Sequence, residues 1–267
     1  MPSSSSARPA EDRRGQILQE VLRSQYVTVA SLARQFDLSE VSIRRNLEQL
    51  EQAGLIKRVH GGAQALSRPG QPSVYDARLL YRIAEKRAIG QAAAALIRPG
   101  ETLFLDSGTT VLEVARAIPE AFLERGGLTL VTRSLVIAGE LRRYRQVRLI
   151  VLGGIYVHDF DDFVGHQVES ALDELHVTTL FVGADGVSPE RGLTTDNVLE
   201  AGLYRQMVRI ADRVVVVTDS VKIGLDKLQT ILPFEDLHTF ITDAGAPAGF
   251  VQMLKDKGVS VLLAPIT

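Results

Sequence analysis

Residues 32 to 63 read LARQFDLSEVSIRRNLEQLEQAGLIKRVHGGA, and this stretch decides the fold of the amino-terminal part of the chain. Thr28 stands at the N-cap position of a short helix whose apolar residues recur at helical spacing. Ser39 caps a second helix, which has an apolar inner face and ends at Gly54. Apolar residues between positions 17 and 22 predict a further helix upstream. The segment is therefore expected to fold as helix, tight turn, helix.

A β-wing is predicted directly after the second of these capped helices. Residues 55 to 59 alternate like a strand, residues 60 to 62 form a turn, and residues 63 to 66 can return as the partner strand. Arg58 and His60 place cationic groups beside this turn. The glycines of the turn would let the backbone approach phosphate groups closely.

The outward face of the helix that follows Ser39 carries Ser42, Arg44 and Arg45. Arginine suits bidentate contact with guanine edges and contact with phosphate, and a serine hydroxyl can bond either partner. This face is therefore a candidate for reading a DNA groove. The alternative is a solvated helix surface on which Glu40 and Arg44 pair at i,i+4.

The same run resembles the winged helix-turn-helix of the DeoR family of bacterial transcription regulators, from Arg14 to about Leu66. The family usually has Thr where Ser42 stands and Asp where Asn46 stands. Asn46 therefore lacks a carboxylate that could orient a neighbouring arginine. By position, the resemblance implies that six residues of the recognition helix and the wing contact DNA, namely Ser39, Ser42, Arg44, Arg45, Arg58 and His60.

Length and composition set the broad class. The 267 residues predict about two domains at roughly 150 residues per domain. The chain has no Cys, which excludes disulfides, thiolate nucleophiles, Cys-ligated zinc and iron-sulfur clusters. Residues 1 to 66 carry 9 Lys and Arg against 7 Asp and Glu, whereas the rest carries 21 against 25, which fits a DNA-binding piece on a non-binding body. No apolar run is long enough for a bilayer and the Ser-rich start lacks a signal-peptide core, so a soluble cytoplasmic protein is predicted.

The patterns predict four segments. Residues 1–11 are polar and expected to be disordered, residues 12–66 form the winged helix-turn-helix domain, residues 67–86 are a linker, and residues 87–267 form an effector-sensing α/β domain. Pro69 and Pro72 give the linker the composition of a hinge. Residues 75 to 97 are expected to be mostly helical, and either to pair subunits or, after Glu85, to pack against the second domain.

The second domain alternates helices with short strands, which predicts a mainly parallel sheet with helices on both faces. Ligands bind to such sheets beyond the carboxyl ends of the strands. Seven strands are expected, at residues 102–105, 128–131, 148–152, 179–182, 214–217, 239–242 and 259–263.

Polar or glycine-rich turns follow five of these strands, and their convergence predicts a polar small-molecule pocket with an anion-binding end. The first turn, residues 106 to 110, leads into a helix whose free backbone N–H groups suit a phosphate. The alternative to a phosphate site is an ordinary helix start, with a Thr as the N-cap residue and a Gly in the turn. The candidate residues in the five turns are Asp106, Gly108, Thr109, Thr110, Thr132, Arg133, Ser134, Gly153, Gly154, Asp185 and Lys222.

The runs DSGTT, GADG and DSVKIG in these turns extend the resemblance to the effector-sensing domain of DeoR regulators, whose fold is similar to that of ribose-5-phosphate isomerases. The resemblance implies that a phosphorylated sugar or a similar intermediate binds there. Lys222 is its expected charge partner, with a structural salt bridge as the alternative. The implied roles are a phosphate cradle of Asp106, Gly108, Thr109 and Thr110, assistance from Thr132 and Ser134, and contacts to the sugar from Asp185, Glu200 and Lys222.

Arg133 stands where the family more often has Asn. A guanidinium cannot accept hydrogen bonds and brings a full charge, so it could clamp a second acidic group or turn out to solvent. The loop at residues 158 to 162 holds three carboxylates and a His, which invites a metal-binding interpretation. A solvated acidic loop is the favoured interpretation, because no second His stands at ligand spacing. Neither a metal nor a cofactor is predicted.

These observations favour a DNA-binding transcription regulator, a repressor of a carbohydrate catabolism operon that a phosphorylated sugar relieves. One small helix-turn-helix reads too few bases, so a homo-oligomer, a dimer or a tetramer, is expected on double-stranded operator DNA. The main alternative is a sugar-phosphate isomerase with Glu200 as the base and Lys222 stabilising an enediolate. A regulator that senses a nucleotide or an unphosphorylated polyol is a third hypothesis.

Overall fold

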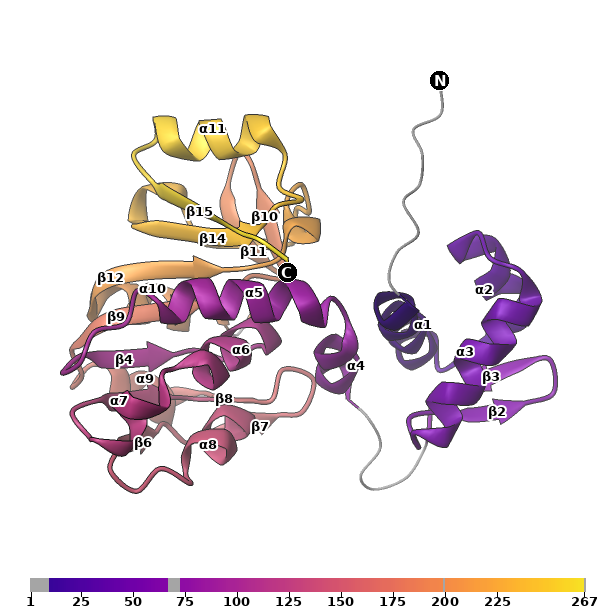
Figure 1. Cartoon of the computed structure of the whole chain (residues 1–267), viewed down its shortest axis with the longest axis horizontal. Coiled ribbons are helices and arrows are strands. Elements are labelled where there is room, and N and C mark those ends of the chain that lie inside the picture. The colour runs from indigo at the N-terminus through magenta and orange to yellow at the C-terminus, as the bar shows by residue number, and fades with distance from the viewer. Residues whose placement is uncertain (1–9, 67–72, 199, 267) are drawn as a thin grey trace. The chain divides into compact units, whose positions relative to one another are not determined.

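The computed structural model describes residues 10–66, 73–198 and 200–266, and the chain divides into two compact units, Met1–Ile83 and Ala84–Thr267 (Figure 1). The boundary between the units lies inside residues 67–86, the predicted linker. The prediction of disorder for residues 1–11 falls almost wholly outside the described residues, as does the Pro-containing part of the linker. In the described ranges, no helix is both long and apolar enough to span a membrane.

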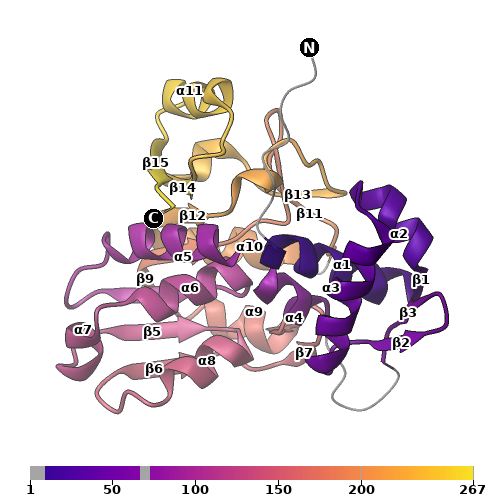
Figure 2. The same ribbon diagram turned by 45° about the vertical axis from the view of Figure 1, so that its right-hand side comes forward.

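The amino-terminal unit combines helices with a small antiparallel sheet of strand order β1-β3-β2, and the β2–β3 hairpin lies beside α3 (Figure 2). This is a winged helix-turn-helix, as the sequence predicts. Its described elements are α1 (Ala10–Ser24), β1 (Tyr26–Thr28), α2 (Val29–Phe36), α3 (Glu40–Gln52), β2 (Lys57–Val59), β3 (Gly62–Gln64) and α4 (Val74–Leu80).

Local hydrogen bonds fix where the helices of this unit begin. The Thr28 hydroxyl accepts a hydrogen bond from the Ser31 backbone N–H at 3.0 Å, and the Ser31 hydroxyl accepts one from the Thr28 N–H at 3.2 Å. This reciprocal capping box starts α2. Asp37, in the left-handed conformation, ends α2, and the Ser39 hydroxyl caps α3. Both predicted N-caps are therefore confirmed.

The helix α4 belongs to the amino-terminal unit. Ala77 is fully buried in the same hydrophobic core as Ile17 and Leu47, and the Tyr81 hydroxyl accepts a hydrogen bond from Gln16 at 3.0 Å. The expectation that residues 75 to 97 are mostly helical is confirmed, with one interruption. Helix α4 ends at Leu80, because its C-cap Tyr81 is extended and Arg82 has a positive φ of 52°, and α5 (Ile83–Ala94) begins anew.

The second unit is built on a seven-stranded sheet in which every neighbouring pair is parallel. All seven predicted strands are present, with bounds that differ by at most three residues, so the α/β fold class is confirmed. The strand order is β15-β14-β12-β9-β4-β5-β6. The strands are β4 (Thr102–Leu105), β5 (Thr129–Thr132), β6 (Arg148–Val151), β9 (Val177–Val182), β12 (Ala211–Val217), β14 (Thr239–Asp243) and β15 (Ser260–Ala264).

Chain direction across the sheet reverses at β4, because β5 and β6 add to one side of it and β9, β12, β14 and β15 add to the other. The carboxyl ends of β4 and β9 therefore form the topological switch point at which open α/β sheets bind ligands. The remaining elements are α6 (Thr109–Ala117), α7 (Glu120–Glu124), α8 (Leu135–Leu141), α9 (His166–Leu172), α10 (Glu200–Arg209), α11 (Ala248–Asp256), η1 (Ser220–Lys222) and η2 (Phe234–Asp236).

Two small sheets were not anticipated from the sequence. One is the antiparallel hairpin of β7 (Ile155–Val157) and β8 (Asp162–Val164). The other has the order β10-β11-β13, formed by β10 (Gly186–Ser188), β11 (Gly192–Thr195) and β13 (Gln229–Leu232).

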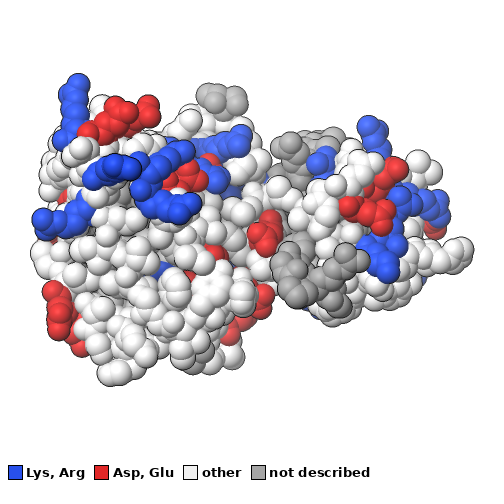
Figure 3. Space-filling model, turned by 90° about the horizontal axis from the view of Figure 1, so that it is seen from below, with Lys and Arg blue, Asp and Glu red and all other residues white. Residues whose placement is uncertain are grey.

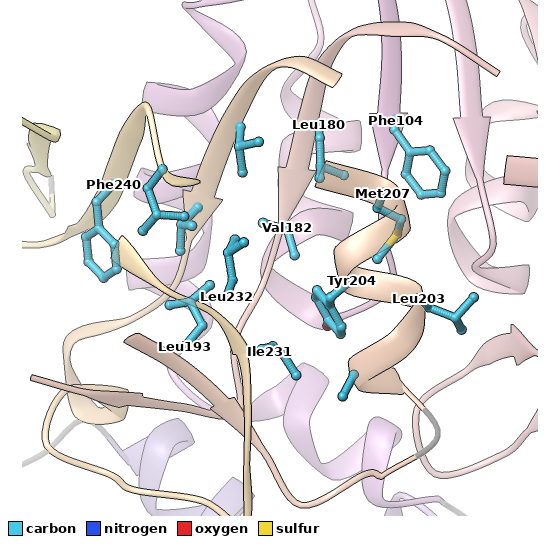
Figure 4. Close-up of a cluster of buried hydrophobic side chains, with 14 of the residues drawn as sticks. Phe104, Leu180, Val182, Leu193, Leu203, Tyr204, Met207, Ile231, Leu232 and Phe240 are labelled. Atoms are coloured by element: carbon cyan, nitrogen blue, oxygen red, sulfur yellow. The ribbon is translucent and has the colours of Figure 1, made fainter. Parts of the chain in front are cut away.

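A continuous hydrophobic core joins this small sheet, α10 and the large sheet (Figure 4). Phe104 and Leu180 come from the central strands, Tyr204 and Met207 from α10, and Leu193 from β11. Burial of such side chains stabilises the unit by roughly 1.5–3 kcal/mol each. The core holds the amino end of α10 next to the carboxyl end of β4, where the polar residues gather.

Candidate functional site

The beginning of α3 presents two serines that bond to each other. The Ser39 hydroxyl accepts a hydrogen bond from the Ser42 backbone N–H at 3.2 Å, and the two hydroxyl oxygens lie 3.0 Å apart. Ser39 is exposed and Ser42 is half-buried. Their first role is to start the helix, and each hydroxyl keeps further hydrogen-bonding capacity for a partner.

Arg44 and Arg45 are both exposed on α3, but their surroundings differ. The guanidinium of Arg44 lies 2.6 Å from a Glu40 carboxylate oxygen, so the surface pairing considered from the sequence does exist. Such an exposed pair contributes only about 0–1 kcal/mol and yields readily to a stronger partner. Among the described ion pairs, none involves Arg45.

The wing places the other two predicted DNA-contacting residues at one end of the unit. Arg58 in β2 donates its backbone N–H to Glu51 at 2.8 Å, and its guanidinium lies 3.9 Å from the same carboxylate. His60 is exposed in the turn. Gly62 is required here, because a Cβ would come within 2.1 Å of the Val27 carbonyl oxygen. On the face of this unit seen at the right of Figure 3, basic side chains gather around a smaller acidic group.

The loop after β4 prepares the amino end of α6. Gly108 is the N-cap residue with φ 113°, a conformation that favours glycine, and it supplies no side-chain cap. The alternative of a Thr N-cap is therefore wrong. Thr109 and Thr110 form the first turn of α6 and are largely buried. The positive end of the helix dipole at this turn is a suitable place for an anion.

Arg133, directly after β5, lies at the centre of the polar cluster and is fully buried, so it does not turn out to solvent. Its Nε lies 2.6 Å from Asp106 Oδ1, one terminal nitrogen lies 2.6 Å from Asp162 Oδ2, and the other lies 3.1 Å from Glu200 Oε1. The same guanidinium donates to the Ser107 hydroxyl at 3.2 Å. One cation thus joins three carboxylates that come from different parts of the chain.

The electrostatics of this cluster follow from burial. Burial raises the pKa of Glu200 to about 8, and the nearby Asp162 and Asp106 carboxylates add to the rise, while Arg133 opposes it. Burial also raises the pKa of Asp106, again against Arg133. For Arg133, burial lowers the pKa, but the carboxylates outweigh it and leave the pKa well above its ordinary value. At neutral pH the cluster therefore holds a charged arginine and a protonated Glu200.

Two oxygens of the cluster have no hydrogen-bond partner among the described residues. They are Asp106 Oδ2 and Asp162 Oδ1, both buried. Unpaired buried acceptors are rare and costly, and they mark the place where a hydroxyl group or water molecule would be stabilised. The cluster can therefore accept hydrogen bonds, whereas the donors of Arg133 are already engaged.

Thr132 and Ser134 flank Arg133 and are fully buried. The Thr132 hydroxyl accepts a hydrogen bond from the Ser134 N–H at 3.1 Å, and the Ser134 hydroxyl caps α8 and donates to Asp161 at 3.0 Å. Asp161 also accepts from the Tyr156 hydroxyl at 2.8 Å. These groups hold the β5–α8 turn rigidly.

The remaining candidates lie outside this cluster. Gly153 and Gly154 are exposed after β6, and a Cβ on Gly154 would meet the Val164 carbonyl oxygen at 2.5 Å. Asp185, after β9, accepts a hydrogen bond from Thr195 at 3.0 Å. Lys222 is half-buried in η1. The structure thus unites Asp106, Arg133 and Glu200 directly, and leaves the other candidates in separate contacts.

Sequence reasoning missed three buried residues, Ser107, Asp161 and Asp162. The loop that contains the two aspartates was interpreted as a solvated acidic loop, and this is wrong for both, since Asp161 is 4% and Asp162 0% exposed. The isolated charge of Arg133 next to a strand end was the one signal for them, because a buried arginine requires acidic partners. No group that could hold a metal ion is found among the described residues.

Comparison with known proteins places this architecture in a class of regulators that join a helix-turn-helix to a sensor domain. Residues 13–68 match the family described as "DeoR-like helix-turn-helix domain", and residues 82–244 match the "DeoR C terminal sensor domain". The chain belongs to the DeoR family, as its motifs predict.

Relatives match over nearly the whole length. A putative aga operon transcriptional repressor from Escherichia coli O157:H7 is 35% identical over 94% of this chain and 93% of its own. The transcriptional repressor AccR from Agrobacterium fabrum is 32% identical over 88% of this chain and 90% of its own. Among solved structures, ribose 5-phosphate isomerase A from Neisseria gonorrhoeae is 15% identical over 52% of each chain, with a TM-score of 0.36.

Proposed function

We propose that this protein is a transcription repressor that binds duplex operator DNA of a carbohydrate catabolism operon and releases it when a phosphorylated sugar binds the second unit. The observation that carries the proposal is the exposed Arg44 and Arg45 face of α3, followed by a wing that presents His60. Ser39, Ser42 and Arg58 complete the proposed DNA contacts. The names of the related repressors support the same function.

The test is an electrophoretic shift of the DNA upstream of the protein's own gene, with and without a panel of sugar phosphates. We expect a protein–DNA complex that dissociates when one of the sugar phosphates is added. A protein that ignores this DNA, and whose melting temperature no phosphorylated sugar raises, contradicts the proposal. If an unphosphorylated polyol or a nucleotide raises the melting temperature instead, the protein is a regulator that senses that class of molecule.

For the effector, we propose that the phosphate binds at the amino end of α6, against the backbone of Gly108, Thr109 and Thr110, with Lys222 as a charge partner. This end lies at the topological switch point of the sheet. Asp185 would accept hydrogen bonds from the sugar hydroxyls. The glycines at 153 and 154 would border the entrance.

Four other candidates are better suited to positioning than to phosphate contact. Asp106 and Glu200 accept hydrogen bonds from Arg133, so both are engaged in this cluster rather than available to a phosphate. We propose that this cluster fixes the β4–α6 loop, and that Thr132 and Ser134 fix the next one. Replacement of Thr110 by Val should then weaken effector binding more than its effect on stability explains, measured by calorimetric titration.

An isomerase activity is not part of the proposal. A general base must reach the proton that it abstracts, whereas Glu200 is 3% exposed and its carboxyl group accepts a hydrogen bond from Arg133. Incubation with ribose 5-phosphate should give no turnover. Turnover that Glu200→Ala abolishes would establish the enzyme instead. We further propose a homo-oligomer that places two recognition helices on repeated half-sites.

A further inference from the structure

A pocket of about 320 Å³ opens between α1 and α3 of the amino-terminal unit. The first turns of α1 supply one wall and a single face of α3 supplies the other, since the contributing positions of α3 are spaced three and four residues apart. The lining residues are Arg13, Arg14, Ser42, Arg45, Asn46 and Gln49.

The lining of this α1–α3 pocket is suited to an anion. Three of its side chains are guanidinium groups, and the other three are uncharged groups that can form hydrogen bonds. None of these six residues is acidic, in contrast to Arg44 and Arg58, which face Glu40 and Glu51. Arginine guanidinium groups match the geometry of phosphate oxygens.

Arg14, in the lining of the pocket, has one side-chain donor that no acceptor in the described ranges satisfies. Its Nε is buried and has no hydrogen-bond partner among the described residues. A buried charged donor without an acceptor is costly, so the site gains when an anionic oxygen arrives. Asn46 is nearly buried and donates to the Ser42 carbonyl oxygen at 2.8 Å, which closes the wall without adding negative charge.

The position of the pocket beside the DNA-reading face of α3 indicates which anion binds there. Ser42 and Arg45 belong both to the pocket and to the proposed DNA-reading face of α3, so the pocket lies at the margin of that face. A helix that enters the major groove has phosphates on either side, and the helix packed beside it reaches the flanking backbone. We propose that the α1–α3 pocket binds one phosphodiester of the DNA backbone, held by Arg14 and Arg45 with Arg13 adding charge. This inference rests on the proposed function and adds α1 to the DNA-binding surface.

Backbone contacts are independent of sequence, so the test needs no knowledge of the operator. The full chain is titrated with a short duplex of random sequence over a range of salt concentrations. Removal of one phosphate contact should lower the slope of log Kd against log salt by about 0.9. We expect this change for Arg14→Gln, with affinity about tenfold weaker at low salt, since a hydrogen bond to a charged group has that magnitude.

Arg23→Gln is the matched control. Arg23 lies at the other end of α1, is exposed, and faces Glu20 at 2.9 Å, so its loss should leave the slope unchanged. Arg14→Lys keeps the charge and should retain most of the slope, which a purely structural role of Arg14 does not predict. Equal slopes for wild type, Arg14→Gln and Arg23→Gln overturn the inference and leave the proposed function intact. A wild-type chain that binds no duplex overturns both.

A second pair of variants adds negative charge without changing side-chain size. Gln49→Glu puts a carboxylate into the pocket, whereas Gln52→Glu puts one at the exposed end of the same helix. We expect Gln49→Glu to weaken duplex binding several times more than Gln52→Glu. Inorganic phosphate serves as the probe for a free anion. If it raises the melting temperature of wild type but not of Arg14→Gln, while duplex binding is equal in both, the pocket binds free phosphate and the inference is wrong.

Discussion

Arg45 and Arg133 are residues of the same type, but one lies at the surface and the other in the interior. Arg45 is exposed on α3, and no described ion pair involves it, whereas Arg133 has no exposed surface and is surrounded by three carboxylates. Both stand in motifs that the sequence marks as functional. An exposed guanidinium is available to an incoming phosphate, while a buried one is committed to the fold. The comparison shows that burial decides which function an arginine in a binding motif can have.

The largest expected effect comes from removing the buried arginine. Arg133→Ala leaves three carboxyl groups in a dry interior without their cation, and breaking a buried ion pair in this way costs about 3–5 kcal/mol. Urea unfolding followed by circular dichroism measures the loss. Arg143→Ala is the control, because its side chain is 63% exposed and pairs with Glu140 at the surface, so a change below about 0.5 kcal/mol is expected. Equal stability of the two variants would show that the buried cluster does not support the fold.

The pH dependence of the second unit should follow from the same cluster. The pKa of Glu200 is about 8 in the folded chain and 4.5 as the ordinary value, so folding takes up a proton between these values. The free energy of unfolding should therefore fall as pH rises from 4.5 to 8, by up to about 1.4 kcal/mol per pH unit, and level off above. The raised pKa of Asp106 acts in the same direction.

Glu200→Gln isolates the contribution of this one carboxyl group, because the amide cannot titrate. Its unfolding free energy should depend less on pH between 4.5 and 8 than that of the wild type, as thermal unfolding in a series of buffers would show. Identical pH profiles for the two proteins would exclude a protonated Glu200.

Replacement of the exposed Arg45 should weaken DNA binding and leave the free energy of unfolding unchanged. Arg45→Ala should weaken operator binding about tenfold and reduce the salt slope by about one, because each phosphate contact accounts for nearly one unit. Arg44→Ala should have a smaller effect, since Glu40 already neutralises part of its charge. Fluorescence anisotropy with labelled DNA distinguishes the two. An unchanged affinity of Arg45→Ala would remove this residue from the DNA-binding surface.

The smallest effect concerns a local contact in the amino-terminal unit. Thr28→Ala removes the capping hydroxyl from α2 and should cost about 1 kcal/mol. Thr28→Ser keeps a hydroxyl at the same place and should restore most of that loss in a thermal unfolding experiment. If Ser and Ala behave alike, the methyl group of Thr28 and not its hydroxyl stabilises the helix.

The regular elements were largely predictable from the sequence. Ser39 and Thr28 mark helix starts because a side-chain oxygen two or three residues before the free N–H groups satisfies them locally. The seven parallel strands are short apolar runs, largely buried except for the edge strands β6 and β15, and polar turns follow five of them, so their places are visible in the sequence. The sheet formed by β10, β11 and β13 escaped prediction in part because one of its pairings joins Thr194 to the distant Thr230.

The candidate site was predictable only in part. The turns at the strand ends follow from local sequence. So does the positive φ at position 108, because a glycine stands there. The break at Tyr81 and Arg82 has no Pro or Gly to announce it, and α4 packs on α1 through Ala77, which no spacing rule reveals. The burial of Asp161 and Asp162 likewise depends on the hairpin that carries them.

The sequence by itself determined the helix caps, the wing, the positions of the parallel strands and the family to which the chain belongs, because each depends on residues close together in the chain. Only the tertiary structure decided the role of Arg133. Its partners Asp106, Asp162 and Glu200 lie 27, 29 and 67 residues away, and they meet only where β4, β5, β8 and α10 come together. The charge of an arginine can be read from sequence, but its binding capacity depends on which groups the fold has already placed around it.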